Sequence, residues 1–376
     1  MASEKIHSQI NYLILILTPI IIIITLLIRP PFTIEIFGIP FTVGDDYFFY
    51  EQNWLNVLQG INPYPMCAYP IGFLAFAGFY FFYPTLPKVF FCLIWLLTIY
   101  LMNKICKKHN ISNNTTIIFC VGWLLINPLY IGTTLIMGHF DILVGFCILL
   151  AVYSADQSEE IKSGIYTALV FLLKFVGLIL AFPLVFMKKK INWRLGISAL
   201  SISGIFYLFG FLFWGTSAFE PILYHIFREP SGSSIFLFFK EVLGIDLSPF
   251  IIPLLIIGVI IVIVFLYSQN NDLSTYSLII LICFNLILPV FYVQYLLWFL
   301  PLALYWSIKH NNALHRMLVL YFSVMYISVQ LAIIPFLSEL QPYFSILSFI
   351  MSVLFVIVLY LYRTKDKELK NTEGDN

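Results

Sequence analysis

Long runs of apolar residues, separated by short polar segments, recur along the whole chain. An α-helix needs about 17–25 mostly apolar residues to cross the hydrocarbon of a bilayer. The pattern predicts an all-α fold, a polytopic membrane protein of about 11–13 transmembrane helices, because in lipid the backbone polar groups must be satisfied within each segment. The predicted spans are residues 11–28, 88–103, 115–133, 141–155, 163–187 (as two short helices), 195–214, 249–267, 275–290, 294–308, 314–337 and 346–362.

Two longer segments between these spans are predicted outer loops: residues 29–87, of mixed character, and residues 215–248. We expect residues 1–362 to form a single transmembrane domain and residues 363–376 to form a charged cytoplasmic tail. Within the first loop, residues 71–83 are apolar and aromatic but short. They fit either a short span or a helix lying in the membrane interface, where Tyr and Phe are favoured.

Basic residues gather between the apolar runs, and the positive-inside rule places such clusters in the cytoplasm. All clusters fall on that side if the N-terminus is inside, if residues 71–83 do not cross, and if residues 163–187 form a hairpin with Lys174 near its outer turn. Both termini are then cytoplasmic and both loops lie outside. If residues 71–83 crossed instead, the first cluster would face outward, so the first arrangement is favoured. The clusters are Lys104 with Lys107 and Lys108, Lys188 to Lys190 with Arg194, Lys309 with Arg316, and Arg363 with Lys365, Lys367 and Lys370.

Composition supports a membrane protein and argues against several other classes. The chain is 61% hydrophobic and only 10% charged, whereas a soluble domain carries about 25% charged residues. A net charge of +1 gives no general attraction to nucleic acid. The six Cys show no spacing typical of a metal site or a disulfide framework. The first apolar run is too long for a signal peptide, and we expect it to remain as an anchor.

The adjacent carboxylates Asp45 and Asp46 stand in the first loop, between long apolar runs. An acid this close to a bilayer is a functional candidate. It could act as a general base, or the pair could hold a divalent cation or shift each other's pKa. If residues 47–59 are helical, the two acids also cap the helix, and Gly60 ends it. The residues alone leave these roles open.

Several other polar residues lie in or next to predicted membrane segments, where a polar side chain is costly. His139 and Asp141 lie at the start of a predicted span. Lys174 lies within an apolar stretch, where a charge is costly unless it is paired, wetted or able to snorkel to the surface. Arg228 in the second outer loop could clamp a phosphate bidentately or pair with Glu229 on the surface.

In their order along the chain, several motifs resemble the GT-C superfamily of membrane glycosyltransferases. The nearest likeness is to the family of GPI mannosyltransferase I (PIG-M) and the prokaryotic polyprenol-phosphate-mannose-dependent transferases. Two departures stand out: the two acids are adjacent here and separated by one residue there, and the polar residues after Arg228 differ. The motifs are Asp45-Asp46-Tyr47, Gly60 with Asn62-Pro63-Tyr64 and Tyr69-Pro70, Gly138-His139-Phe140-Asp141, Leu223-Tyr224-His225 with Arg228, and Val293-Gln294-Tyr295-Leu296-Leu297-Trp298 with Pro301.

The resemblance implies inverting transfer of a hexose, mannose by this likeness, from a polyprenyl or dolichyl phosphate donor to a glycan or glycolipid acceptor on the outer face. The membrane would be the cell membrane, or the endoplasmic reticulum in a eukaryote. The donor is a substrate and no other cofactor is implied, although a divalent metal could sit at Asp45 and Asp46. Membrane lipids would be partners, and an accessory membrane subunit is a further candidate partner. The implied roles are Asp46 or Asp45 as catalytic base, Lys174, Arg228 and His225 on the donor phosphate, and Tyr47, Tyr64, His139, Asp141, Gln294 and Tyr295 in substrate binding.

A transporter or flippase of a lipid-linked or small solute is the alternative function. Lys174 and His139 would then line its pathway. The sequence shows no evident inverted repeat, and the carboxylates lie in a loop and not at the membrane midplane, which argues against this class.

Overall fold

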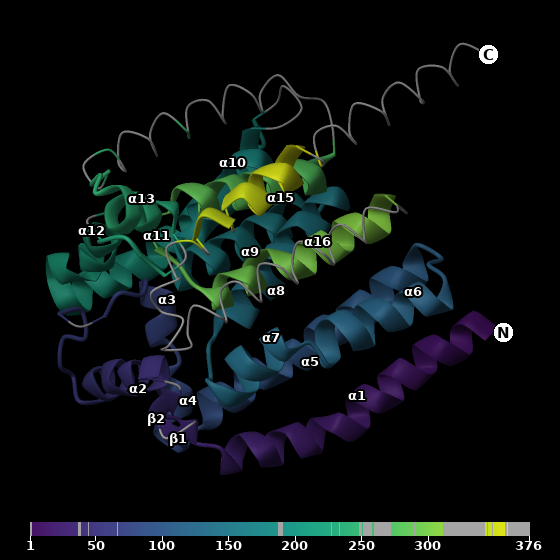
Figure 1. The fold of residues 1–376 in the computed structure, drawn as a ribbon, viewed down its shortest axis with the longest axis horizontal. Helices are drawn as coiled ribbons and strands as arrows, with labels where there is room; N and C mark the ends of the chain where they lie inside the picture. Colours follow the sequence, from purple (N-terminus) through teal and green to yellow (C-terminus); the bar gives the residue numbers. More distant parts are fainter. Residues whose placement is uncertain are drawn as a thin grey trace. The chain divides into compact units, whose positions relative to one another are not determined.

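The structure is a computed structural model. It describes residues 2–36, 39–43, 45–65, 67–186, 191–226, 228–232, 234–247, 250, 258, 272–288, 290–310, 343, 345–347, 349–357 and 359. Their contacts divide the chain into two compact units. Unit 1 comprises Met1–Ala181, Asn192–Phe227 and Leu297–Asn311, and unit 2 comprises Phe182–Ile191, Arg228–Leu296 and Asn312–Asn376. Helices form most of the elements, which confirms the predicted all-α class (Figure 1).

Unit 1 contains the long helices and the first loop. Its elements are α1 (Ala2–Leu27), β1 (Phe32–Ile36), β2 (Ile39–Val43), α2 (Asp45–Leu58), α3 (Ile71–Leu74), α4 (Ala77–Phe82), α5 (Leu86–Lys108), α6 (Asn113–Ile117), the π-helix η1 (Ile118–Leu125), α7 (Pro128–Tyr130), the π-helix η2 (Ile131–Ile136), α8 (Asp141–Asp156), α9 (Glu160–Leu173), α10 (Val176–Phe186) as far as Ala181, α11 (Trp193–Trp214), the 3₁₀ helix η3 (Gly215–Phe219), α12 (Glu220–Ile226), and α16 (Leu296–His310) from Leu297 on.

Among the described residues, four helices are long and apolar enough to cross a membrane, and they confirm the membrane class. They are Glu4–Leu27, Leu86–Lys108, Asn113–Ile136 and Trp193–His225. The predicted spans 249–267 and 314–337 lie outside the described residues, apart from residues 250 and 258. The total of about 11–13 spans therefore stays a prediction.

Helix α8 is the centre of unit 1. It packs against α5 and α9, while α9 also packs against α11 and α5 against α1 (Figure 1). Between its terminal acids α8 is apolar all round, and Val144, Ile148 and Val152 are fully buried. A helix without a polar face is stable only when other elements surround it. The apolar run thus explains why Asp141 at its start is fully buried and Asp156 at its end is half-buried.

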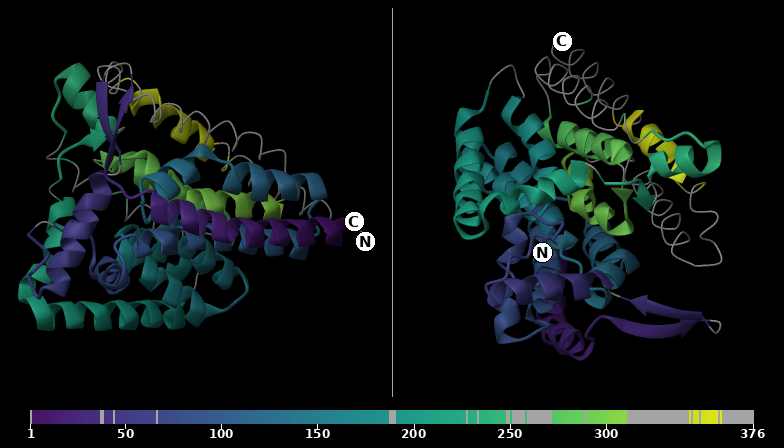
Figure 2. Two further views of the ribbon diagram at one scale, coloured as in Figure 1. Left: turned by 90° about the horizontal axis from the view of Figure 1, so that it is seen from below. Right: turned by 90° about the vertical axis from the view of Figure 1, so that its left-hand side faces the viewer.

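The first loop contains a β-hairpin that the sequence did not predict. Strands β1 and β2 pair antiparallel, with Phe32 opposite Val43 and Ile36 opposite Ile39. Their β-branched and aromatic residues favour strands. The hairpin projects away from the helices of unit 1 (Figure 2). It leads directly into α2, whose first residue is Asp45.

The start and end of α2 agree with the sequence prediction. Asp45 and Asp46 lie in its first turn. Gly60, with a positive φ of 70°, ends it: the Gly60 N–H donates to Val57 O and the Ile61 N–H donates to Asn56 O. This pair of bonds satisfies the last carbonyls of a helix and favours glycine at the left-handed position. Asn62 then turns the chain by accepting a hydrogen bond from the Tyr64 N–H.

Residues 71–83 form two short helices, α3 and α4, of 4 and 6 residues. Each is much shorter than the roughly 17 residues needed to cross a bilayer. Phe81, Phe82 and Tyr83 are exposed directly before α5 begins. Exposed aromatic side chains at the start of a spanning helix are typical of the membrane interface. These features favour the interpretation in which this segment does not cross.

The predicted break in residues 163–187 is present. Helix α9 ends at Leu173, α10 begins at Val176, and Lys174 has an extended backbone with φ −151° and ψ 140°. The break therefore removes Lys174 from a continuous helix face. The side of the membrane on which it lies stays a prediction.

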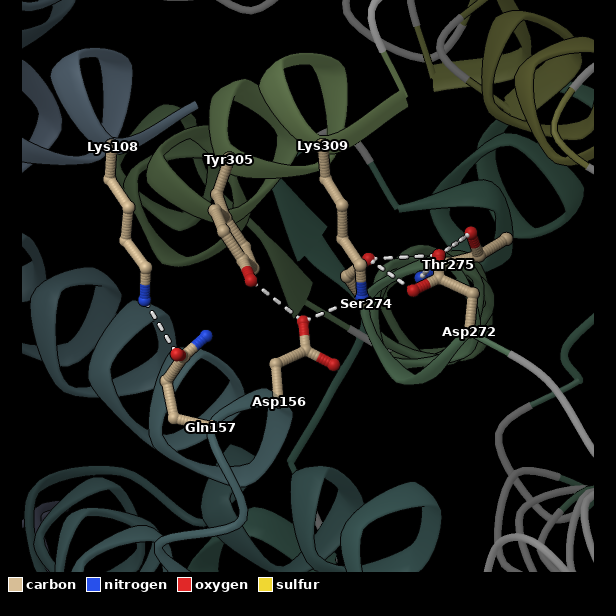
Figure 3. A network of polar contacts seen from close by, with 8 residues as sticks. All are labelled: Lys108, Asp156, Gln157, Asp272, Ser274, Thr275, Tyr305 and Lys309. Carbon is tan, nitrogen blue, oxygen red and sulfur yellow. Dashed lines mark hydrogen bonds and ion pairs between the residues drawn. The ribbon is translucent and has the colours of Figure 1, made fainter. Parts of the chain in front are cut away.

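Unit 2 contains the other described elements: β3 (Ser231–Gly232), α13 (Ile235–Leu243), α15 (Leu273–Ile287), β4 (Val290–Phe291) and the 3₁₀ helix η5 (Val293–Tyr295). Strands β3 and β4 pair in parallel. Asp272 caps α15 by accepting hydrogen bonds from Ser274 Oγ, the Thr275 N–H and Thr275 Oγ1 (Figure 3). Such a cap satisfies the free N–H groups of a helix start.

Candidate active site

Four ionisable side chains of unit 1 form a row, in the order Asp46, His139, Asp141 and Lys174. Asp46 is its exposed member. Its side chain is 44% exposed, and its Oδ2 lies 3.5 Å from His139 Nδ1. The Tyr50 hydroxyl, one helical turn further along α2, lies 3.2 Å from the same nitrogen. Residues four apart lie on one face of a helix, so α2 directs Asp46 and Tyr50 together at His139.

Tyr50 keeps its proton in this place. Burial raises the pKa of its phenol well above the usual value, and the charges of Asp46 and Asp141 raise it further. Its hydroxyl is therefore a hydrogen-bonding group at neutral pH. It also accepts a long hydrogen bond, 3.5 Å, from the Tyr69 hydroxyl.

His139 is positioned by the turn between η2 and α8. Gly138 has a positive φ of 77°, and a Cβ at this residue would lie 2.6 Å from Tyr47 Cδ2. Only glycine meets both conditions without strain. The His139 N–H donates to Thr133 O at 2.8 Å, which fixes the turn on the preceding π-helix. The predicted Gly138 to Asp141 turn thus places His139 between α2 and α8.

Asp141 is the first residue of α8 and its side chain is fully buried. Its Oδ1 accepts a hydrogen bond of 2.5 Å from Trp298 Nε1 and lies 3.7 Å from Lys174 Nζ. Its Oδ2 lies 4.0 Å from His139 Nδ1 and has no hydrogen-bond partner among the described residues. The N-terminal end of a helix stabilises a negative charge, so this carboxylate fits its position at the start of α8.

Lys174 completes the row from the break between α9 and α10. Its side chain is 9% exposed. Its Nζ lies 4.6 Å from the ring centre of Tyr69, 4.9 Å from that of Phe140 and 5.7 Å from that of Trp298. Aromatic faces attract a cation, more strongly when it is desolvated. The carboxylate and the rings together offset the cost of burying this ammonium group.

An aromatic wall surrounds the row. Ring centres are 5.3 Å apart for Tyr50 and Tyr69, 5.5 Å for Tyr50 and Phe140, 4.7 Å for Tyr69 and Phe73, and 5.1 Å for Phe73 and Phe140. Such a wall keeps water from the inner members of the row. The arrangement leaves Asp46 accessible to a hydroxyl group and holds His139, Asp141 and Lys174 behind it.

Three other predicted residues of unit 1 lie around this row in different settings. Tyr47 is fully buried and donates its hydroxyl hydrogen to Pro84 O at 2.8 Å. Tyr64 is buried against Trp214, with ring centres 5.6 Å apart. Substrate binding by Tyr47 and Tyr64 stays a prediction, which this burial does not favour.

His225, on α12, is the third. Its Nε2 donates to Ala68 O at 2.7 Å, and its ring packs edge-on against Phe175, next to Lys174. It therefore belongs to the surroundings of the row.

Three further predicted residues belong to unit 2. Arg228 Nη2 donates to the Tyr292 hydroxyl at 3.3 Å, and Ser231 Oγ lies 3.2 Å from the same hydroxyl. Tyr295 is buried, with its ring 5.9 Å from that of Tyr292, and Gln294 is half-buried beside it in η5. The surface alternative for Arg228 was a pair with Glu229; in the structure Glu229 Oε2 lies 3.5 Å from Lys240 Nζ.

The suggestion of a metal at Asp45 and Asp46 stays a prediction. The Asp45 side chain lies outside the described residues. Among those described, no group of three or more His, Cys, Asp or Glu side chains is placed to hold a metal ion.

Three side chains that contact the row, Tyr50, Tyr69 and Trp298, had no site role in the sequence reasoning. Tyr50 was recognisable only as the residue four after Asp46 on a predicted helix. Trp298 and Tyr69 appeared only within the motifs that carry the family resemblance. No local signal marks Trp298 as the donor to Asp141, because the two are 157 residues apart in the chain.

The fold and the site define a polytopic helical membrane protein with an acidic site in its first large loop. The model of glycosyltransferase family 87 matches residues 65–289, more than half of the chain. The chain therefore belongs to this family of GT-C-type membrane glycosyltransferases. The matched segment includes His139, Asp141 and Lys174, whereas Asp46 precedes it. No curated protein gives a significant match.

Proposed function

We propose that this glycosyltransferase moves a hexose, mannose in the first instance, from a polyprenyl or dolichyl phosphate to a glycan or glycolipid acceptor on the outer face of the membrane, with inversion. The observation that carries the proposal is the position of Asp46. It is the exposed end of a row whose other members are buried and paired. An accessible carboxylate on a rigid support is what a general base requires.

In the proposed reaction the acceptor hydroxyl oxygen attacks the anomeric carbon of the sugar while its proton passes to the Asp46 carboxylate. The new glycosidic bond forms as the bond from that carbon to the phosphate oxygen breaks. The polyprenyl phosphate leaves with the electron pair, so no acid is needed to protonate it. Asp46 releases the proton to water after the product departs. Attack from the side opposite the phosphate inverts the anomeric configuration.

The leaving phosphate gains charge in this step and needs cationic or hydrogen-bonding groups. Arg228 and His225 are the proposed groups, as the family resemblance implies. Arg228 carries a guanidinium suited to bidentate phosphate binding. Lys174 was the third candidate, but its ammonium group faces Asp141 and three aromatic rings. Its contacts favour a role inside the protein.

The proposal is tested with purified protein in lipid, supplied with radiolabelled polyprenyl-phosphate mannose and a membrane lipid extract. Asp46→Asn and Asp45→Asn are assayed beside it, with folding checked by size-exclusion chromatography and thermal unfolding. We expect label in a new product with the native protein and none with a folded Asp46→Asn variant. Normal transfer in both variants would remove the assigned base.

A second assay with polyprenyl-phosphate glucose separates an error in the proposed sugar from an error in the proposed reaction class. Transfer from glucose alone would keep the mechanism and correct the sugar. Absence of transfer from both donors, together with solute flux into proteoliposomes, would favour the transporter alternative over the proposed function.

A further inference from the structure

His139 Nδ1 stands between two carboxylates of different surroundings. It lies 3.5 Å from Oδ2 of the exposed Asp46 and 4.0 Å from Oδ2 of the buried Asp141. Both carboxylates attract the imidazole, and charges interact more strongly in a buried, low-dielectric setting. If His139 is to orient the Asp46 carboxylate, another charge must weaken the attraction between His139 and Asp141.

Lys174 supplies that compensation from the far side of Asp141. Its Nζ lies 3.7 Å from Asp141 Oδ1, the oxygen that also accepts from Trp298. Oδ2 on the other side faces His139. The ammonium group therefore balances the buried negative charge without contacting His139 in any described interaction.

The surroundings of Lys174 suit a resident counter-ion. Its side chain is 9% exposed and its ammonium group lies near the rings of Tyr69, Phe140 and Trp298. A group that met a lipid-linked phosphate would need an open approach for a bulky anion. Removing one partner of a buried ion pair leaves the other as an uncompensated charge, which is more costly than removing both.

We infer that Lys174 is a positioning residue: it neutralises Asp141, and thereby leaves His139 to orient the Asp46 carboxylate for proton abstraction. This inference rests on the proposed function, and it changes the role that the family resemblance implied for Lys174. It predicts that the lysine acts on turnover through Asp141 and not on the affinity for the donor phosphate.

The test is a double-mutant cycle with four proteins: native, Lys174→Met, Asp141→Asn, and the two changes combined. For each we measure kcat, the KM for polyprenyl-phosphate sugar, and the unfolding temperature. We expect each single change to lower kcat by about tenfold or more, because it leaves one buried charge unpaired. The combined variant should recover about tenfold over Lys174→Met, since contacting residues are strongly coupled. The donor KM should stay within about twofold throughout.

Lys174→Arg keeps the charge and should retain more activity than Lys174→Met. The control is a second lysine–aspartate pair, half-buried Asp156 with Lys309, joined at 2.8 Å at the other end of α8 (Figure 3). The same cycle there, with Lys309→Met and Asp156→Asn, should show coupling in unfolding temperature while kcat is unchanged. A purely structural role for Lys174 would reproduce that control result.

The inference is overturned if Lys174→Met raises the donor KM about tenfold and the combined variant recovers nothing, because Lys174 would then bind the donor. If a single variant does not fold, folding of the combined variant supports the pairing, and its failure to fold contradicts it. If the native protein transfers no sugar, the proposed function fails first. The unfolding temperatures then still decide whether Lys174 and Asp141 are coupled.

Discussion

Helix α8 begins and ends with an aspartate, and each aspartate meets a lysine and an aromatic hydrogen-bond donor. At the start, Asp141 contacts Lys174 and Trp298. At the end, Asp156 accepts from Lys309 Nζ and the Tyr305 hydroxyl, both at 2.8 Å (Figure 3). The helix dipole favours the negative charge at the start and opposes it at the end. The tighter ion pair of Asp156 is thus the one that must offset an unfavourable dipole.

The two ends differ in what lies beyond the ion pair. Next to Asp156, Lys108 of α5 bonds Gln157 Oε1, a contact that joins α5 to the residue after α8 (Figure 3). Beyond Asp141 the row continues through His139 to the exposed Asp46. We therefore expect similar pairs to serve different purposes: one ties helices together, and the other supports the exposed Asp46 carboxylate. Chemistry is expected at the end where the row reaches solvent.

The largest difference between the ends should appear in turnover. Asp46→Asn removes the proposed general base, and such a group is worth about 10²- to 10⁴-fold in rate. Asp156→Asn should lower the unfolding temperature and leave kcat within about twofold. Both variants are measured by radiolabel transfer and by thermal unfolding. Equal losses of turnover would break the distinction between the two ends.

Gly138→Ala tests the turn that positions His139. The change adds a Cβ 2.6 Å from Tyr47 Cδ2 at a φ of 77°, with an expected cost of about 2–4 kcal/mol from left-handed strain and overpacking. Gly60→Ala is its matched control, because φ is 70° but nothing lies within 4 Å of the added Cβ. That variant should lose about 1 kcal/mol and keep its turnover. Chemical denaturation measures the free energy of unfolding of both variants. A smaller loss of stability in Gly138→Ala than in Gly60→Ala would contradict the role of this turn.

Gly145→Ala tests the close approach of α8 and α16 near Asp141. An added Cβ would collide with the Leu297 carbonyl oxygen, directly before Trp298. We expect overpacking to cost about 1–3 kcal/mol and to weaken the bond from Trp298 to Asp141. Gly122→Ala, where nothing lies within 4 Å of the added Cβ, should be neutral or stabilising. The unfolding temperature and kcat of both variants are measured. Unchanged turnover in Gly145→Ala would show that the site tolerates this displacement.

The smallest effect should come from removing one hydroxyl at each end. Tyr50→Phe removes the contact of 3.2 Å to His139, and Tyr305→Phe removes the bond of 2.8 Å to Asp156. Each should cost about 1 kcal/mol of stability, the net worth of a typical hydrogen bond. Only Tyr50→Phe should also slow turnover, by several-fold. If Tyr305→Phe slowed turnover equally, the assignment of a purely structural role to that end of α8 would fail.

Local signals in the sequence were sufficient for several elements of the site. The acids before an amphipathic stretch and Gly60 after it predicted α2 nearly to the residue. The basic clusters on either side of residues 163–187 predicted the break at Lys174, because the positive-inside rule required a hairpin there. The signals for α2 are reliable because capping and glycine conformation act within a few residues of the chain.

The sequence by itself determined the membrane class, the helix boundaries around the site and the presence of acids in the first loop. Only the tertiary structure decided which groups meet. It buried Tyr47 and formed the unpredicted β-hairpin. It also joined Trp298 to Asp141 across 157 residues and set Lys174 beside them. Such pairings depend on how whole helices pack, and packing is a property of surfaces brought together from distant segments, which no local pattern specifies.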